Sequence, residues 1–221
     1  MQKETLKFLK DLKKNNNREW FDVNRERYRE AMADFTGFVS ELIEAISKFD
    51  SSISRVRARD CVFRIFRDVR FAKDKSPYKT NFGAFISSGG KKQARPGYYF
   101  HIAPGEVFAA AGVYMPPSPE LNRIRSAIAE DAAPLRKFLK SADFKKNFKE
   151  LWGEKVKTAP RGYAKDHPDL DLLQFKSYIV SMDYKEEDIF RDGFKKSICT
   201  TFRAAMPLNL FLAKALDART K

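Results

Sequence analysis

The sequence has no run of about eighteen apolar residues, so it does not predict a transmembrane helix. The opening residues, MQKETLKFLKDLKKNNN, lack the apolar run and small-residue cleavage site of a signal peptide. Cysteine is scarce, and Cys61 and Cys199 lie in apolar stretches, which is typical of buried free thiols in a reducing compartment. We therefore expect a cytoplasmic protein with no membrane partner.

Several catalytic and binding motifs are also missing. The patterns GxxxxGK[ST], GxSxG, HExxH and CxxC do not occur, and SSGGKK does not match a phosphate loop. No motif puts a base beside either cysteine, so thiol nucleophilic catalysis has little support. The sequence therefore predicts no cofactor and no metal. It names no reaction and leaves the oligomeric state open.

Positive charge is abundant and concentrated in one part of the chain. The 221 residues carry 43 basic and 29 acidic side chains, a net charge of +14. Residues 55–103 hold twelve basic and three acidic residues, whereas residues 1–54 are balanced at ten each. A basic surface with a focus indicates an anionic partner, although the same excess also serves solubility.

Hydrophobic periodicity predicts one α+β domain over residues 1–221. Apolar residues recur every three or four positions within 5–16 and 17–50, which predicts an N-terminal helical segment over 1–54. Residues 55–115 show a period near two, with turn residues between short apolar runs, and predict an antiparallel β-meander of about four or more strands. Residues 116–221 return to a mainly helical pattern, which Pro207 should interrupt. The sheet is expected to pack against N-terminal and C-terminal helices.

The strand expected over 60–71 carries unusual charge. In a regular strand Arg67 would share one face with four large apolar residues: Phe63, Ile65, Val69 and Phe71. An unpaired guanidinium there is costly, so Arg67 must meet a carboxylate, water or an anion. Arg64 and Arg70 flank Asp68 on the other face. The outgoing turn at Ser76–Pro77 adds three lysines: Lys73, Lys75 and Lys79.

Two further segments contribute candidates. His101 alternates with apolar neighbours in YYFHIAP, and a half-buried structural histidine is the plainer interpretation. The loop APRGYAKDHP carries Arg161, Tyr163, Asp166 and His167 between two prolines, which makes it rigid enough to aim side chains. Its acids could resemble metal ligands, but Pro168 followed by acids is more typical of a helix start.

These residues form the predicted site. The anion-binding candidates are Arg64, Arg67, Arg70, Lys73, Lys75, Lys79 and Arg161. The acid–base candidates are Asp68, Asp74, His101, Asp166 and His167. Two tyrosines are expected to support them: Tyr78 and Tyr163.

Three blocks together resemble a known family. They are NNNREWFDVNRERY (15–28), FRIFRDVRFAKDKSPYKTNFGAF (63–85) and PRGYAKDHP (160–168), and their order and spacing resemble domain of unknown function 2461 over roughly residues 3–215. The resemblance implies an α+β domain of this size but no activity. AAAGVYMPP departs from the family pattern, because alanine stands where a further glycine is usual.

Three hypotheses remain open at this stage. The basic residues can bind a small anionic or phosphorylated ligand, with the protein an enzyme or not. They can also bind nucleic acid beside an aromatic sheet face that stacks bases. A third interpretation is an ion-pair network that only holds the fold.

Overall fold

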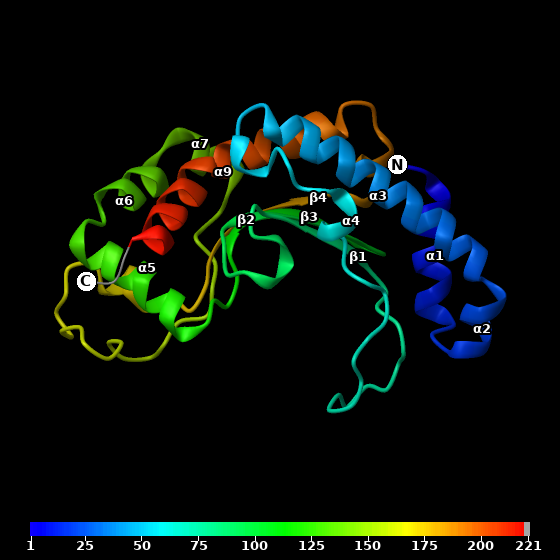
Figure 1. Cartoon of the computed structure of the whole chain (residues 1–221), viewed down its shortest axis with the longest axis horizontal. Coiled ribbons are helices and arrows are strands. Elements are labelled where there is room, and N and C mark those ends of the chain that lie inside the picture. The colour runs from blue at the N-terminus through cyan, green and yellow to red at the C-terminus, as the bar shows by residue number, and fades with distance from the viewer. Residues whose placement is uncertain (219–221) are drawn as a thin grey trace.

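The computed structural model describes residues 1–218, which form an arch with a β-sheet at its crown (Figure 1). Four antiparallel strands lie in the order β1-β2-β3-β4. Their bounds are β1 Phe82–Ile86, β2 Gly97–Ala103, β3 Glu106–Val113 and β4 Tyr178–Tyr184. The predicted α+β class with an antiparallel sheet and helices at both ends of the chain is confirmed.

The two faces of the sheet differ because side chains alternate along each strand. On β2, Tyr98, Phe100 and Ile102 point to the covered face and are buried at 0–1% exposure. Tyr99 and His101 point to the opposite face and are only half-buried. The register carries this division across the sheet, since Tyr99 pairs with Phe85 on β1 and His101 pairs with Phe108 on β3.

Long amphipathic helices cover the first face. In Figure 1, α3 and α9 run across the crown of the arch with α1 beside them. They span Lys3–Lys14 (α1), Arg25–Ser47 (α3) and Phe194–Asp217 (α9). Phe35 of α3 packs against Phe82 and Phe100, with ring centroids 5.5 and 5.9 Å apart. The apolar stripe read from the sequence is therefore the stripe that binds the sheet.

Shorter helices build the two sides of the arch. One side holds α2 (Arg18–Val23), and the other holds a group between β3 and β4, while α4 (Ala58–Cys61) lies beside β1 (Figure 1). That group comprises α5 Ser118–Glu130, α6 Ala133–Lys140, α7 Ala142–Asn147 and α8 Leu170–Leu173. Three short 3₁₀ turns complete the described elements: Ser51–Ile53, Gly90–Lys92 and Glu186–Phe190.

The predicted strand over 60–71 is wrong. Helix α4 ends at Cys61, and the following chain pairs with the sheet at a single bridge, Val62 to Ala84. A second bridge, Phe66 to Tyr78, joins two segments that both lie outside the sheet. Residues 66–78 then leave the body as a projecting loop, here called the finger (Figure 1). Because the chain leaves the sheet, Arg67 does not lie on an apolar face, and Phe71 is 97% exposed.

Two helix boundaries also differ from the prediction. The helix expected over 17–50 is divided at Asn24, whose backbone ends α2 and precedes α3. Pro207 does not interrupt α9, which continues through it to Asp217. Proline removes one helical hydrogen bond, but Phe202, Leu208 and Leu212 on either side are fully buried, and their packing holds the helix together.

Strand β4 lies in the segment that was expected to be mainly helical. Its outer edge pairs with the chain near Trp152, whose backbone exchanges two hydrogen bonds with Ile179, 2.7 and 3.1 Å long. These bonds cover an edge that would otherwise expose unpaired amides. Among residues 1–218, no helix has the length and apolar character needed to cross a membrane.

Candidate functional site

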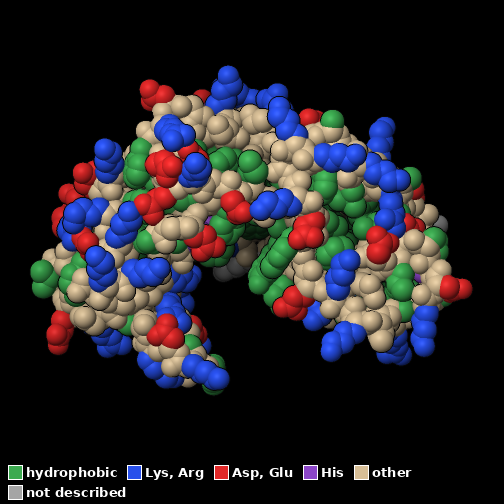
Figure 2. Space-filling model, turned by 180° about the vertical axis from the view of Figure 1, so that it is seen from behind, with side chains coloured by type: hydrophobic (Ala, Val, Ile, Leu, Met, Phe, Trp, Pro, Cys, Tyr) green, Lys and Arg blue, Asp and Glu red, His purple; other side chains and the backbone are tan. Residues whose placement is uncertain are grey.

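The open face of the sheet forms the floor of a cleft of about 850 Å³, here called the sheet-face cleft. Seen from behind, the molecule is hollowed beneath the sheet, between the finger and the opposite side of the arch (Figure 2). Side chains from all four strands line it, among them Phe85, Tyr99, Phe108 and Ile179. An apolar concave floor with a few polar groups is typical of ligand sites.

Cations gather at the β1 edge of the sheet-face cleft. The ammonium groups of Lys79 and Lys91 lie 5.5 and 5.4 Å from the centre of the same ring, that of Phe63. Lys91 also donates to the backbone carbonyl of Val62. Burial, together with the positive charges of Arg64 and Lys91, lowers the pKa of Lys79. Within residues 1–218, neither the two lysines nor Arg64 has a carboxylate within 4 Å.

A polar pair occupies the middle of the cleft. The Tyr99 hydroxyl and His101 Nδ1 are 3.1 Å apart, and the imidazole stacks on Phe108 at 4.6 Å. His101 Nε2 is buried without a hydrogen-bond partner among the described residues and lies 3.8 Å from the Glu106 carboxylate. Burial lowers the pKa of His101, and burial with the Glu106 charge raises the pKa of Tyr99 to about 12. Both groups are therefore neutral near pH 7.

Gly83 makes room for this pair. A Cβ at Gly83 would lie 2.5 Å from the Tyr99 hydroxyl oxygen and 3.1 Å from the adjacent ring carbon. The tyrosine therefore lies directly over the glycine of the neighbouring strand. Glycine in a strand often marks such a close approach, so Gly83 fixes where the Tyr99 hydroxyl can lie.

Exposed aromatics bound the far end. Tyr114 and Trp152 stack at 6.4 Å with an interplanar angle of 17°, and both are about half exposed or more. Gly112 permits the close strand contact beneath them, because it has a φ of +127° and an added Cβ would lie 2.0 Å from the Tyr178 carbonyl oxygen. Asp183 lies on the open face of β4, and Glu106 also lines the cleft. These two carboxylates make one corner of the cleft acidic.

The finger holds most of the predicted cations, and the structure places them outside this cleft. Arg67 pairs with Asp74 and donates to the Ser76 carbonyl, while Asp74 accepts from the Ser76 hydroxyl and backbone amide. The Ser76 contacts and Arg67 lower the pKa of Asp74. Arg70 holds Asp68 through two guanidinium contacts of 3.0 and 2.7 Å. The Arg67–Asp74 pair connects the outgoing and returning halves of the finger, whereas the Arg70–Asp68 pair is local to the outgoing half.

Two more predicted residues serve the finger's structure. Lys75 donates to the carbonyls of Val69 and Arg70 at 3.1 and 3.4 Å. Tyr78 is buried and stacks on Phe21, with centroids 3.9 Å apart, where the finger joins the body. Lys73 is exposed on the finger. Of the predicted cations, only Lys79 lines the sheet-face cleft, with Arg64 beside it.

The loop over 160–168 lies on the other side of the arch from the finger (Figure 1), so Arg161 does not join the basic cluster. His167 Nδ1 accepts from the Asp169 amide at 3.0 Å, and its ring packs edge-on against Tyr163. Arg136 binds the nearby acids Asp169 and Asp171. Asp166 and Arg161 are exposed. In the described chain, no three His, Cys, Asp or Glu side chains form a cluster that could hold a metal ion.

The anion-binding and acid–base candidates left out several residues that line the cleft: Asn81, Lys91, Tyr99, Glu106, Trp152 and Asp183. Tyr99 carried a usable signal, because it alternates on β2 with His101 and therefore shares its face. Lys91 was not among the candidates, although it lies in SSGGKK. No local pattern brings Trp152 to this face, since its position depends on pairing with β4.

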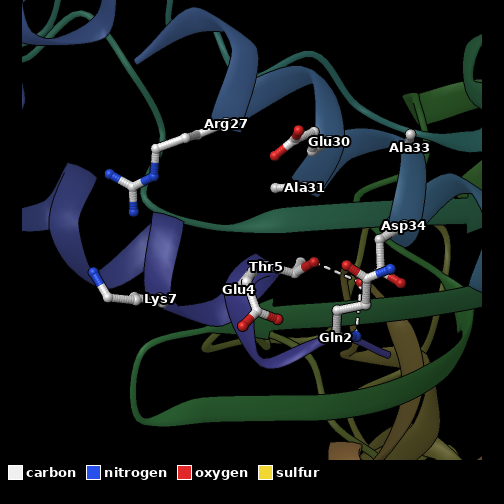
Figure 3. A pocket seen from close by; sticks show the side chains of 9 residues that line it. All are labelled: Gln2, Glu4, Thr5, Lys7, Arg27, Glu30, Ala31, Ala33 and Asp34. Carbon is white, nitrogen blue, oxygen red and sulfur yellow. Dashed lines mark hydrogen bonds between the residues drawn. The ribbon is translucent and has the colours of Figure 1, made fainter. Parts of the chain in front are cut away.

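A second hollow of about 730 Å³ lies between α1 and α3 (Figure 3). Asp34 there accepts hydrogen bonds from the Thr5 hydroxyl at 2.5 Å and the Gln2 amide at 3.0 Å. Arg27 is turned to Asp11, with a contact of 2.7 Å. Glu4 and Glu30 also line this hollow and have no cation within 4 Å among residues 1–218, so its unpaired charge is negative, unlike that at the cation edge of the sheet-face cleft.

The comparisons with known proteins concern the family alone. No curated protein and no solved structure matches the chain. A family described as conserved hypothetical protein, DUF2461, matches residues 4–211, which is nearly the whole chain. The resemblance carried by the three sequence blocks is thereby confirmed, and the chain belongs to the DUF2461 family of conserved hypothetical proteins.

Proposed function

We propose that the sheet-face cleft binds a small organic anion, such as a carboxylate or a phosphorylated metabolite. The carrying observation is the pair of lysines at its β1 edge, Lys79 and Lys91, with Arg64 beside them; none of the three has a carboxylate partner in the described chain. The ammonium groups of Lys79 and Lys91, both held over the Phe63 ring, repel each other. A bound anion would relieve that repulsion, so the site favours a negatively charged ligand.

The rest of the cleft supports an organic ligand rather than a simple ion. Phe85, Phe108 and Ile179 offer apolar floor, and the Tyr99–His101 pair offers neutral hydrogen-bonding groups. A volume of about 850 Å³ falls within the range of metabolite and drug-sized sites. The two free thiols fit a reducing compartment, and we propose that the protein works in the cytoplasm.

This proposal moves the site from the finger to the finger's base. The finger's arginines already hold aspartates, which fits the hypothesis that those charges are structural. Arg64 and Lys79 flank the finger in the chain; Lys79 lines the cleft and Arg64 lies beside it.

Calorimetry with phosphate, pyrophosphate, small carboxylates and sugar phosphates tests the proposal. Lys79→Met and Lys91→Met should each weaken anion binding about ten- to a hundredfold, the value of a charge-assisted contact. Lys73→Met is the matched control, because Lys73 lies on the finger outside the cleft and should bind normally. Absence of binding by every anion, or equal weakening in the control, would contradict the proposal.

Single-stranded nucleic acid is the second candidate. The exposed Tyr114–Trp152 stack favours it, because bases stack on such platforms. Against it, Glu106 and Asp183 line the same cleft and would repel successive phosphates. Fluorescence anisotropy with single-stranded RNA and DNA across a salt series separates the two. Phosphate contacts are strongest at low salt, so a lack of binding there would exclude this candidate.

A further inference from the structure

Lys79 has no carboxylate partner, unlike several other lysines of the protein. Lys10, Lys176 and Lys195 each hold a glutamate at 2.5–3.1 Å. Lys79 is half-buried in the sheet-face cleft, with no hydrogen-bond acceptor for its amine in the part of the chain that the structure describes. An amine in such surroundings has the features of a nucleophile rather than of an ion-pair partner.

We propose that Lys79 forms a Schiff base with the carbonyl group of an anionic substrate bound in the sheet-face cleft. This inference rests on the proposed function, because Arg64 and Lys91 would hold the anionic group while Lys79 attacks. The substrate class is a carbonyl compound with a carboxylate or phosphate a few bonds away. A 2-oxo acid and a phosphorylated aldehyde share this chemistry.

The geometry supports the division of roles between the two lysines. Both ammonium groups lie about 5.5 Å from the Phe63 ring centre, but Lys91 is exposed and donates to a carbonyl, whereas Lys79 is not so engaged. Burial and the neighbouring cations lower the pKa of Lys79, which increases the neutral fraction that can attack. Desolvated lysines beside a second cation are activated in this way.

The step balances without a cofactor. The Lys79 Nζ lone pair forms a bond to the carbonyl carbon, and the carbonyl π electrons move to oxygen, which gains a proton as nitrogen loses one. The resulting carbinolamine takes up one more proton from solvent, loses its hydroxyl as water and becomes an iminium ion. Tyr99, which keeps its proton at neutral pH, lines the same cleft and would donate a hydrogen bond to that oxygen.

Reductive trapping tests the inference. The full-length protein is incubated near pH 7 with sodium cyanoborohydride and glyoxylate, pyruvate or glyceraldehyde 3-phosphate, and adducts are located by peptide mass mapping. Lys79 should be labelled on the order of tenfold faster than Lys73, because the bound carbonyl has a high effective concentration. Comparison of the two carboxylates, glyoxylate and pyruvate, with glyceraldehyde 3-phosphate shows which anionic group the cleft accepts. Glyceraldehyde, which is neutral, should label Lys79 more slowly.

Two variants make the outcome specific. Lys79→Arg keeps the charge but has no nucleophilic amine, so it should retain phosphate binding and lose the fast adduct. Lys91→Met should keep an adduct at Lys79 but slow its formation with anionic carbonyls. Because Lys73 is an internal control in the wild-type protein, the comparison holds even where a variant fails to fold.

The results separate this inference from the function on which it rests. Equal labelling of Lys79 and Lys73 while phosphate still binds would overturn the Schiff base and leave the anion site standing. Fast labelling of Lys79 by neutral and anionic aldehydes alike, with no anion binding, would overturn the proposed function and the anionic substrate. Fast, anion-selective labelling that pyrophosphate suppresses supports both.

Discussion

Replacing Gly83 by alanine tests the packing at the centre of the cleft. The new Cβ would lie 2.5 Å from the Tyr99 hydroxyl oxygen and 3.1–3.2 Å from two ring atoms, so the ring must move. The Tyr99–His101 contact of 3.1 Å would then be lost. Overpacking of this kind costs about 1–3 kcal/mol and a lost hydrogen bond about 1 kcal/mol. Replacing a glycine in a strand by alanine by itself raises the free energy of unfolding by about 0.5–1 kcal/mol.

We therefore expect Gly83→Ala to lower the free energy of unfolding by about 1–3 kcal/mol, measured by urea denaturation. Gly37→Ala is the matched control, because nothing lies within 4 Å of its added Cβ on helix α3. That control should raise stability by up to about 1 kcal/mol, since alanine is the better helix former.

A double-mutant cycle with Tyr99→Phe sharpens the test. Without the hydroxyl, the nearest atom to the new Cβ is a ring carbon at 3.1 Å, and no Tyr99–His101 bond remains to lose. Gly83→Ala should then cost at least about 1 kcal/mol less than in the wild-type background. An equal cost in both backgrounds would refute the argument that Tyr99 is what Gly83 accommodates.

The remaining predictions concern charge and reactivity. Lys79→Met should raise stability, by less than about 1 kcal/mol because the amine is partly hydrated, while weakening anion binding about ten- to a hundredfold. The folded-state pKa of Lys79 is lowered, so this gain should be full at neutral pH and vanish above the unfolded value near 10.5, as urea titrations across pH would show. Asp74→Asn frees Arg67, so limited trypsin digestion should cleave the finger faster with the melting temperature unchanged; an unchanged cleavage rate would mean that the pair does not hold the finger. Burial raises the pKa of Cys61 to about 11, so a thiol reagent at pH 8 should label half-buried Cys199 first and Cys61 only on unfolding.

The charged block over 63–86 shows where prediction from the local sequence pattern succeeds and where it fails. Its composition correctly indicated that Arg67 needs a partner, and Asp74 seven residues away is that partner. The assumption of a regular strand was wrong, because the chain pairs with β1 only at Val62 and turns outward after Phe66. Alternation of charged and apolar residues is shared by strands and by loops that hold themselves together with ion pairs, so periodicity could not separate them.

The candidate site shows a similar division. His101 and Lys79 were singled out from the sequence, and both line the sheet-face cleft. Arg161 was grouped with the basic block because of its residue type and loop, yet it lies on the other side of the arch. Nothing local in a sequence records whether two distant loops face each other.

Local sequence pattern alone predicts the long helices, strands β1 to β3 and the alternation that leaves Tyr99 and His101 on one face of β2. These features depend on neighbours a few residues away, which a single sequence displays. The remaining features, strand β4 and the cleft, depend on contacts between segments that are distant in the sequence. Strand β4 joins β3 across some sixty residues, and only that pairing completes the floor and brings Trp152 to the cleft. The cation edge likewise exists only because two distant lysines pack on Phe63, so long-range packing rather than local pattern creates the site.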